Sequence, residues 1–288
     1  MAWLLLALSV VACKSDKKAK PEVPAGGAQR VVSISPSTTE TIYVLGAPSR
    51  LVGRSRYCDW PEEVKKLPQV GGYVDPSYEA ILALRPDLVV GARGPSGSAL
   101  TERIEQRGVP TFFPPTETFA EIDEMILGLG KRVDRADAAR AYFDALHARL
   151  AEIERAVAGK PRRRVLLVFG LEPVSVAGPA SFADEMIRRA GGKNVVEQGG
   201  GYPTLNVEEV LRLDPDVVIN AAVAETMGKH RLGKETPGWS RVRAVRDDRV
   251  VPIAEESVLR PGPRIAAGVA LLARAIHPDA NLPDAGPP

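Results

Sequence analysis

Residues 77–90 read SYEAILALRPDLVV, and residues 206–219 read NVEEVLRLDPDVVI. The two stretches align without a gap, and equivalent residues such as Asp87 and Asp216 lie 129 positions apart. Each stretch has apolar residues at helical spacing, then a proline, then a short run typical of a buried strand. The match indicates an internal duplication on the scale of a domain, because solenoid repeats recur every ~20–50 residues. Chance similarity between two amphipathic helix-to-strand units is the alternative.

The alternation of helices and strands continues outward from both stretches. In the first half, strands are predicted at 30–35, 51–53, 88–91 and 109–113, and helices at 36–46, 75–84 and 100–107. In the second half, strands are predicted at 164–170 and 217–219, and helices at 182–190 and 207–213. Ser37 and Glu40 have the spacing of a capping box at the start of the first helix. The pattern predicts an α/β fold of two Rossmann-like lobes, each with a mostly parallel central sheet.

A long helical pattern separates the two halves. Apolar residues recur every three or four positions from Val133 to Val157, and a Gly-Lys-Pro sequence then ends the pattern. About 25 helical residues span roughly 37 Å, which is comparable to a domain diameter. We therefore expect one rigid linking helix and a ligand cleft between the lobes. The expected boundaries are an N-terminal lobe at 30–130, the linking helix at 131–160 and a C-terminal lobe at 161–277.

The first residues are typical of an export signal that ends in a lipidated cysteine. The apolar run at 2–13 is shorter than the ~20 residues that cross a membrane and has the length of a signal-peptide core. Its end, Val-Val-Ala-Cys13, followed by polar residues, resembles a bacterial lipobox. The start lacks Lys and Arg, so the true start lies upstream or the signal is atypical. The alternative is an apolar tail with an incidental cysteine.

A lipidated Cys13 would place the protein on the periplasmic or cell-surface face of a bacterial membrane. Residues 1–13 are then the signal peptide and lipidated cysteine. Residues 14–29 mix Lys, Pro, Ala and Gly and are expected to form a flexible tether, and the Pro-rich residues 278–288 a disordered tail. Cys58 would be left without a disulfide partner and is expected to be a small buried apolar residue.

The composition and charge narrow the class of function. Apolar residues make up 44% and charged residues 26% of the 288 residues, as in soluble globular proteins. The net charge of +2 gives no support to nucleic-acid binding, which usually shows a marked basic excess. The three histidines are widely spaced, and no zinc-type pair, nucleophile elbow, P-loop or dinucleotide fingerprint is present. We therefore expect no metal site, no resident cofactor and no enzymatic reaction; an extracytoplasmic enzyme that uses the cleft is the alternative.

Several of the scarce aromatic residues lie beside predicted breaks rather than on core faces. They are Tyr57, Trp60, Tyr73, Phe169 and Tyr202. Loops at strand ends near a lobe interface are the expected place for ligand contacts. Large rings there could cover a broad apolar or macrocyclic ligand through area burial and stacking. The alternative is that each ring packs against its own domain.

Glu79 and Glu208 occupy matching positions in the two duplicated helices, each in the first turn. Complementing the helix dipole, which contributes ~0.3–1 kcal/mol, is a sufficient reason for either residue alone. It does not require the same arrangement in both lobes. Two separated carboxylates on a rigid body would suit docking to two arginine clusters on a symmetric partner.

These motifs together resemble the helical-backbone periplasmic binding proteins of ABC importers, most closely the cobalamin-binding ones. The resemblance spans nearly all of residues 30–277 and is carried by the segments at 30–40, 57–61, 70–73, 79–90, 169–170 and 260–264. It implies that a corrinoid lies between the lobes against Tyr57, Trp60, Tyr73, Phe169 and Tyr202. It also implies that Glu79 and Glu208 dock the loaded, monomeric protein onto a permease dimer with its ATPase.

One departure from the cobalamin-binding pattern bears on the ligand. That family can place a large aromatic residue just after the strand at 88–91, where this chain has Ala92 and Arg93. A different corrinoid, a ferric siderophore or haem is therefore the alternative cargo, because carriers of these ligands share the architecture. Manganese and zinc carriers of similar shape use histidine ligands, and none stands at these positions.

Overall fold

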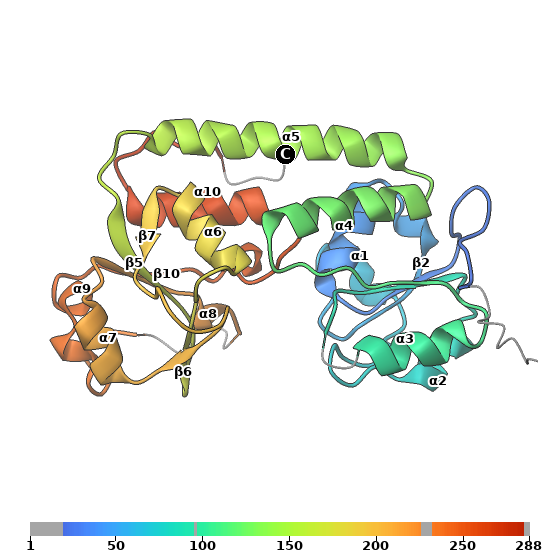
Figure 1. Ribbon diagram of the computed structural model, residues 1–288, viewed down its shortest axis with the longest axis horizontal. Helices are drawn as coiled ribbons and strands as arrows, with labels where there is room; N and C mark the ends of the chain where they lie inside the picture. Colours follow the sequence, from blue (N-terminus) through green and yellow to red (C-terminus); the bar gives the residue numbers. More distant parts are fainter. Residues whose placement is uncertain (1–19, 95–96, 226–231, 285–288) are drawn as a thin grey trace, which may run out of the picture.

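The computed structural model describes residues 20–94, 97–225 and 232–284, which form two α/β lobes joined along one side by helices (Figure 1). The N-terminal sheet has the strand order β2-β1-β3-β4 with every pair parallel. Its lobe contains β1 (Val31–Ser33), α1 (Pro36–Val44), β2 (Leu51–Arg54), α2 (Tyr78–Ala83), β3 (Leu88–Val90), α3 (Gly97–Glu105), β4 (Thr111–Phe112) and α4 (Phe119–Arg132).

The C-terminal sheet has the order β10-β9-β5-β6-β8, and β7 also pairs with β5. Its elements are β5 (Arg163–Leu171), β6 (Val174–Val176), α6 (Phe182–Arg189), β7 (Gly192–Asn194), β8 (Thr204–Leu205), α7 (Val207–Leu213), β9 (Val217–Asn220), α8 (Ala222–Glu225), α9 (Arg243–Arg246), β10 (Val250–Pro252) and α10 (Ile265–Ile276). Short 3-10 turns lie at Pro48–Arg50, Glu62–Lys66, Trp239–Arg241 and Glu256–Val258. The tight turn after β5 makes its pair with β6 antiparallel, and β6 is also antiparallel to β8.

The internal duplication has a structural counterpart in both lobes. The helix of each repeat ends before a residue in the left-handed region, Arg85 with φ 48° and Asp214 with φ 42°. In each lobe an aspartate then accepts a backbone N–H of the first strand, Asp87 from Arg30 and Asp216 from Arg164, both at 2.8 Å. The two arginine side chains in turn donate to carbonyls at the helix ends, Arg30 to those of Leu84 and Arg85, and Arg164 to those of Leu213 and Asp214. The same local chemistry therefore fixes the helix-to-strand turn in both halves.

The long helix α5 (Ala136–Val157) covers both lobes (Figure 1). It packs on α4 of the N-terminal lobe and on α10 and α6 of the C-terminal lobe. Residues 131–132, which we expected in this helix, belong to the end of α4. The chain turns between the two helices, where Asp134 has φ 49° and the Arg135 N–H donates to the Gly130 carbonyl.

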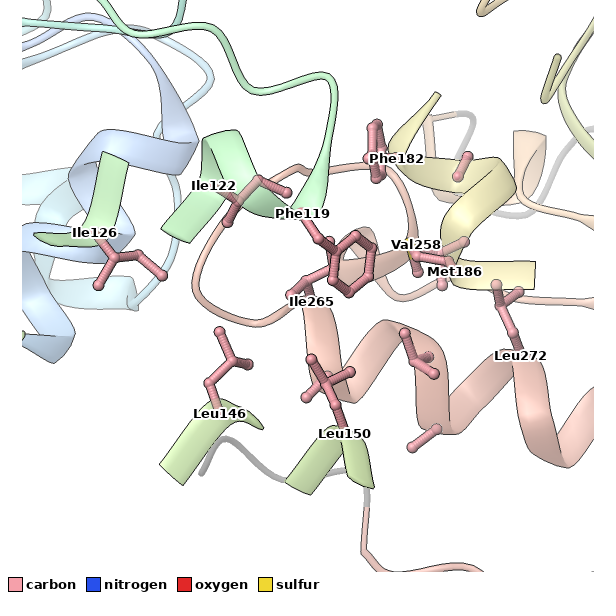
Figure 2. Packing of buried hydrophobic residues seen from close by; sticks show 14 of the residues in the cluster. Phe119, Ile122, Ile126, Leu146, Leu150, Phe182, Met186, Val258, Ile265 and Leu272 are labelled. Carbon is pink, nitrogen blue, oxygen red and sulfur yellow. The ribbon is translucent and has the colours of Figure 1, made fainter. Parts of the chain in front are cut away.

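A single apolar core continues beneath α5 from one lobe into the other. Figure 2 shows Phe119 of α4, Leu150 of α5 and Ile265 of α10 converging, and all three belong to one cluster of buried residues. The same cluster contains residues on one face of each sheet, such as Val31 and Val165. The two lobes are therefore joined by continuous packing as well as by one connecting helix.

The packed part of the chain begins before and ends after the predicted lobe limits. Gly27 and Ala28, expected in the tether, are buried, and the Ala28 N–H donates to the Arg132 carbonyl. Ala280 and Leu282, expected in the tail, pack on the core without forming a helix or strand. Among the described residues no helix is both long and apolar enough to cross a membrane. Residues 1–19, including Cys13, lie outside the described residues.

Candidate ligand site between the lobes

Tyr202 is the aromatic residue that links the two lobes. It precedes β8 in the C-terminal lobe, and its side chain is 45% exposed. Its ring centroid lies 5.8 Å from that of Phe169 and 6.4 Å from that of Phe182. Its hydroxyl donates a hydrogen bond of 3.3 Å to Oε2 of Glu117, which lies between β4 and α4 of the other lobe. Two of the predicted rings, Phe169 and Tyr202, are therefore brought together where the lobes meet.

Tyr73 contributes a second phenol from the N-terminal lobe. Its hydroxyl donates to the Arg93 carbonyl at 2.7 Å. Burial first, and then the charge of Glu117, raise the pKa of Tyr73. Burial, Glu117 and Tyr73 likewise raise the pKa of Tyr202 well above its usual value. The two phenols and the carboxylate of Glu117 therefore interact electrostatically at the junction of the lobes.

Tyr57 lies against Gly72 and is 49% exposed. A Cβ on Gly72 would come within 3.1 Å of Cε2 of Tyr57, which places this ring against the residue before Tyr73. The neighbouring Val74 is also exposed. Tyr57 and Val74 therefore expose apolar surface around the loop of Tyr73, and an exposed ring such as Tyr57 can stack on a flat ligand.

Trp60 has a different environment from the other predicted rings. Its ring meets Tyr43 of α1 edge-on at 6.1 Å, and the guanidinium of Arg264 lies 4.6 Å from its centroid. Arg264 comes from the segment before α10, so Trp60 packs where the C-terminal part of the chain returns to the N-terminal lobe. The structure does not bring Trp60 into contact with Phe169 or Tyr202.

Glu40 is the buried centre of an ion-pair network at that return. Its side chain is 1% exposed and accepts hydrogen bonds from Arg264 Nε and Nη2, both at 2.8 Å, and from Arg260 Nη1 at 3.2 Å. Arg260 also binds Asp59 at 2.7 Å and Glu256 at 2.7 Å. Burial alone would raise the pKa of Asp59, but the hydrogen bond and charge of Arg260 lower it. The network ties the segment 256–264 to the N-terminal lobe.

The capping box predicted for Ser37 and Glu40 is wrong. Ser35 is the N-cap residue of α1 without a side-chain cap bond, and Glu40 binds the two arginines instead. Its partners follow more than 200 residues later, so local spacing gave no sign of them. Glu117 was also missed, because a single glutamate between a strand and a helix carries no pattern of its own.

Glu79 and Glu208 occupy equivalent helix positions in the structure. Each is exposed and stands in the first turn, after the N-cap residues Ser77 of α2 and Asn206 of α7. Figure 1 shows α2 and α7 on the side of the molecule opposite α5, one in each lobe. The two exposed carboxylates therefore belong to equivalent helices, one in each lobe.

The carboxyl ends of the C-terminal strands add a cavity of about 510 Å³. Its lining includes Asn220 at the end of β9, Pro252 at the end of β10, and Glu255. Among the described residues, no group of three or more His, Cys, Asp or Glu side chains is arranged to hold a metal ion. The buried thiol of Cys58 accepts a hydrogen bond from Thr39 at 3.0 Å, and burial raises its pKa.

Comparison with known proteins places this architecture in a family. A family model described as "Periplasmic binding protein" matches residues 31–256, which include both sheets and α5. The chain belongs to the periplasmic binding protein family. This periplasmic binding protein is 28% identical over 250 residues to the vitamin B12-binding protein of Salmonella typhimurium, covering 86% of this chain and 90% of that one.

Two further relatives bear on the class of transport protein. An uncharacterized ABC transporter substrate-binding lipoprotein of Bacillus subtilis, YvrC, is 27% identical over 259 residues, covering 87% of this chain and 81% of that one. The crystal structure of a periplasmic haem-binding protein from Pseudomonas aeruginosa superposes with a TM-score of 0.77 at 29% identity, covering 89% of this chain and 96% of that one. The present chain is thus a solute-binding protein of the ABC transporter class, and its family places it outside the cytoplasm.

Proposed function

We propose that this protein captures cobalamin or a related corrinoid between its lobes and delivers it to an ABC permease with its ATPase. The observation that carries the proposal is the junction of the lobes, where Tyr202 packs near Phe169, donates to Glu117 of the other lobe and is influenced by the nearby Tyr73. A corrinoid is broad and flat with a polar rim. Stacked rings with a few placed polar groups suit such a ligand. The relationship to a vitamin B12-binding protein supports the same choice.

Haem, or a ferric siderophore, is the second candidate cargo. The similarity to a haem-binding protein favours it, as do the two phenol hydroxyls, because tyrosine serves as an axial haem ligand in some proteins. Arg93, which stands where a large aromatic residue can occur in the cobalamin-binding proteins, points the same way. The protein is proposed to act by binding alone, and its cargo is transported rather than used as a cofactor.

Delivery is proposed to use Glu79 and Glu208. Both carboxylates are exposed and belong to different lobes, on helices that lie on the side of the molecule opposite α5 (Figure 1). A permease dimer could pair each of them with arginine side chains. Anchoring through a lipid on Cys13 would keep the monomeric protein near that permease at the membrane surface.

The cargo is tested by calorimetry on the purified protein. Cyanocobalamin, haemin and a ferric siderophore are titrated separately into wild type, Tyr202→Ala and Tyr202→Phe. We expect cyanocobalamin to bind wild type most tightly and Tyr202→Ala to bind it more weakly, whereas Tyr202→Phe keeps the ring and most of the affinity. Preference for haemin would support the second candidate. Absence of binding by all three, with folding intact, would rule out both.

A further inference from the structure

Glu117 is an exposed carboxylate at the meeting point of the lobes. It accepts the hydroxyl of Tyr202 from the opposite lobe, and within the described part of the chain it forms no ion pair with a basic side chain. A carboxylate offers about four lone-pair positions, and Tyr202 uses one of them. Glu117 therefore keeps capacity to accept hydrogen bonds from a molecule held between the lobes.

The carboxylate of Glu117 is the charged group that acts on both phenols, while the exposed Arg93 contributes its backbone carbonyl to Tyr73. Glu117 raises the pKa of both Tyr73 and Tyr202, and for each phenol only burial has a larger effect. Arg56, the cation beside Tyr57, is paired with Asp75 at 2.8 Å. A ligand edge that reaches the Tyr73–Tyr202 pair therefore meets an acceptor with negative charge.

We propose that Glu117 determines specificity by selecting cargo whose rim carries hydrogen-bond donors over cargo whose rim carries carboxylates. This inference rests on the proposed function, because it concerns the edge of the same ligand. The primary amides of a corrinoid can donate N–H groups to the free lone pairs of Glu117. The carboxylates of a porphyrin or of an unamidated corrin would instead face a like charge at close range, which opposes binding.

The test compares two corrins that differ in their rim. Dicyanocobinamide carries amides, and dicyanocobyrinic acid carries carboxylates at the corresponding positions. Their dissociation constants are measured by calorimetry at pH 7.5 and physiological salt for wild type, Glu117→Gln and Glu124→Gln. Glutamine keeps an oxygen for Tyr202 and removes the charge. Glu124 is an exposed residue of α4 and serves as the control for general charge.

We expect wild type to bind dicyanocobinamide more tightly than dicyanocobyrinic acid. In Glu117→Gln the ratio of their two dissociation constants should move toward one by about tenfold or more. The same variant should bind dicyanocobyrinic acid more tightly, because the like charge is gone, and dicyanocobinamide more weakly, because a charged acceptor is lost; Glu124→Gln should leave the ratio unchanged. An unchanged ratio in Glu117→Gln, with tight binding of corrins, overturns the role of Glu117 alone. Failure of both corrins and of cyanocobalamin to bind folded wild type overturns the proposed cargo together with this inference.

Discussion

Replacing Glu40 by glutamine should destabilise the whole protein. The buried carboxylate holds Arg260 and Arg264, whose side chains are also largely buried, and the change leaves both guanidinium groups without their shared anion. Removing one member of a buried ion pair costs about 3–5 kcal/mol. For a chain of this size, each kcal/mol lowers the unfolding midpoint by ~2–4 °C, so a decrease of roughly 6–20 °C is expected.

The matched control is Glu256→Gln. Glu256 binds the same Arg260 at 2.7 Å, but its side chain is 36% exposed, and such pairs contribute about 0–1 kcal/mol. Both variants are measured by urea unfolding at pH 7 and by thermal unfolding. If Glu40→Gln costs no more than Glu256→Gln, Glu40 does not hold the network together, and the reasoning from burial is refuted.

Three further predictions concern titration, the loop of the site and docking. Because the native pKa of Tyr202 is raised, the free energy of unfolding should fall as the pH rises above the ordinary tyrosine value of about 10, and Tyr202→Phe should weaken that fall in urea titrations at pH 9–11. Gly71→Ala should weaken cyanocobalamin binding in calorimetry, because Gly71 has φ 99° and a Cβ would meet a backbone oxygen at 2.5 Å in the loop of Tyr73; unchanged affinity would show that this loop does not position the ligand. Charge reversal at both Glu79 and Glu208 should impair uptake by cells while cyanocobalamin affinity stays nearly constant, and lost affinity would instead place these acids in the ligand site.

The parts of the fold that depend on local chemistry were predictable from the sequence. Both ends of the helix at 207–213 were predicted correctly. Asn206 caps its start, and the left-handed residue Asp214 ends it. The duplicated turns at Asp87 and Asp216 follow for the same reason. The break between α4 and α5 was missed, since the apolar spacing continues through Val133 while the backbone turns at Asp134.

The candidate site was predictable only in its residue types. Aromatic residues beside strand ends pointed to Phe169 and Tyr202, which the structure brings together. Which ring serves which purpose depends on partners far along the chain. Trp60 packs against Arg264, and Tyr202 reaches Glu117, 85 positions away. No local pattern encodes such pairs, because they arise only when the two lobes are joined.

The continuous core beneath α5 has a consequence for either half of the molecule taken alone. In the intact chain α4 and α10 belong to one buried apolar interior. Cutting the chain between the halves would expose that interior to water in both fragments. Neither half is therefore expected to be stable by itself, although each contains its own sheet.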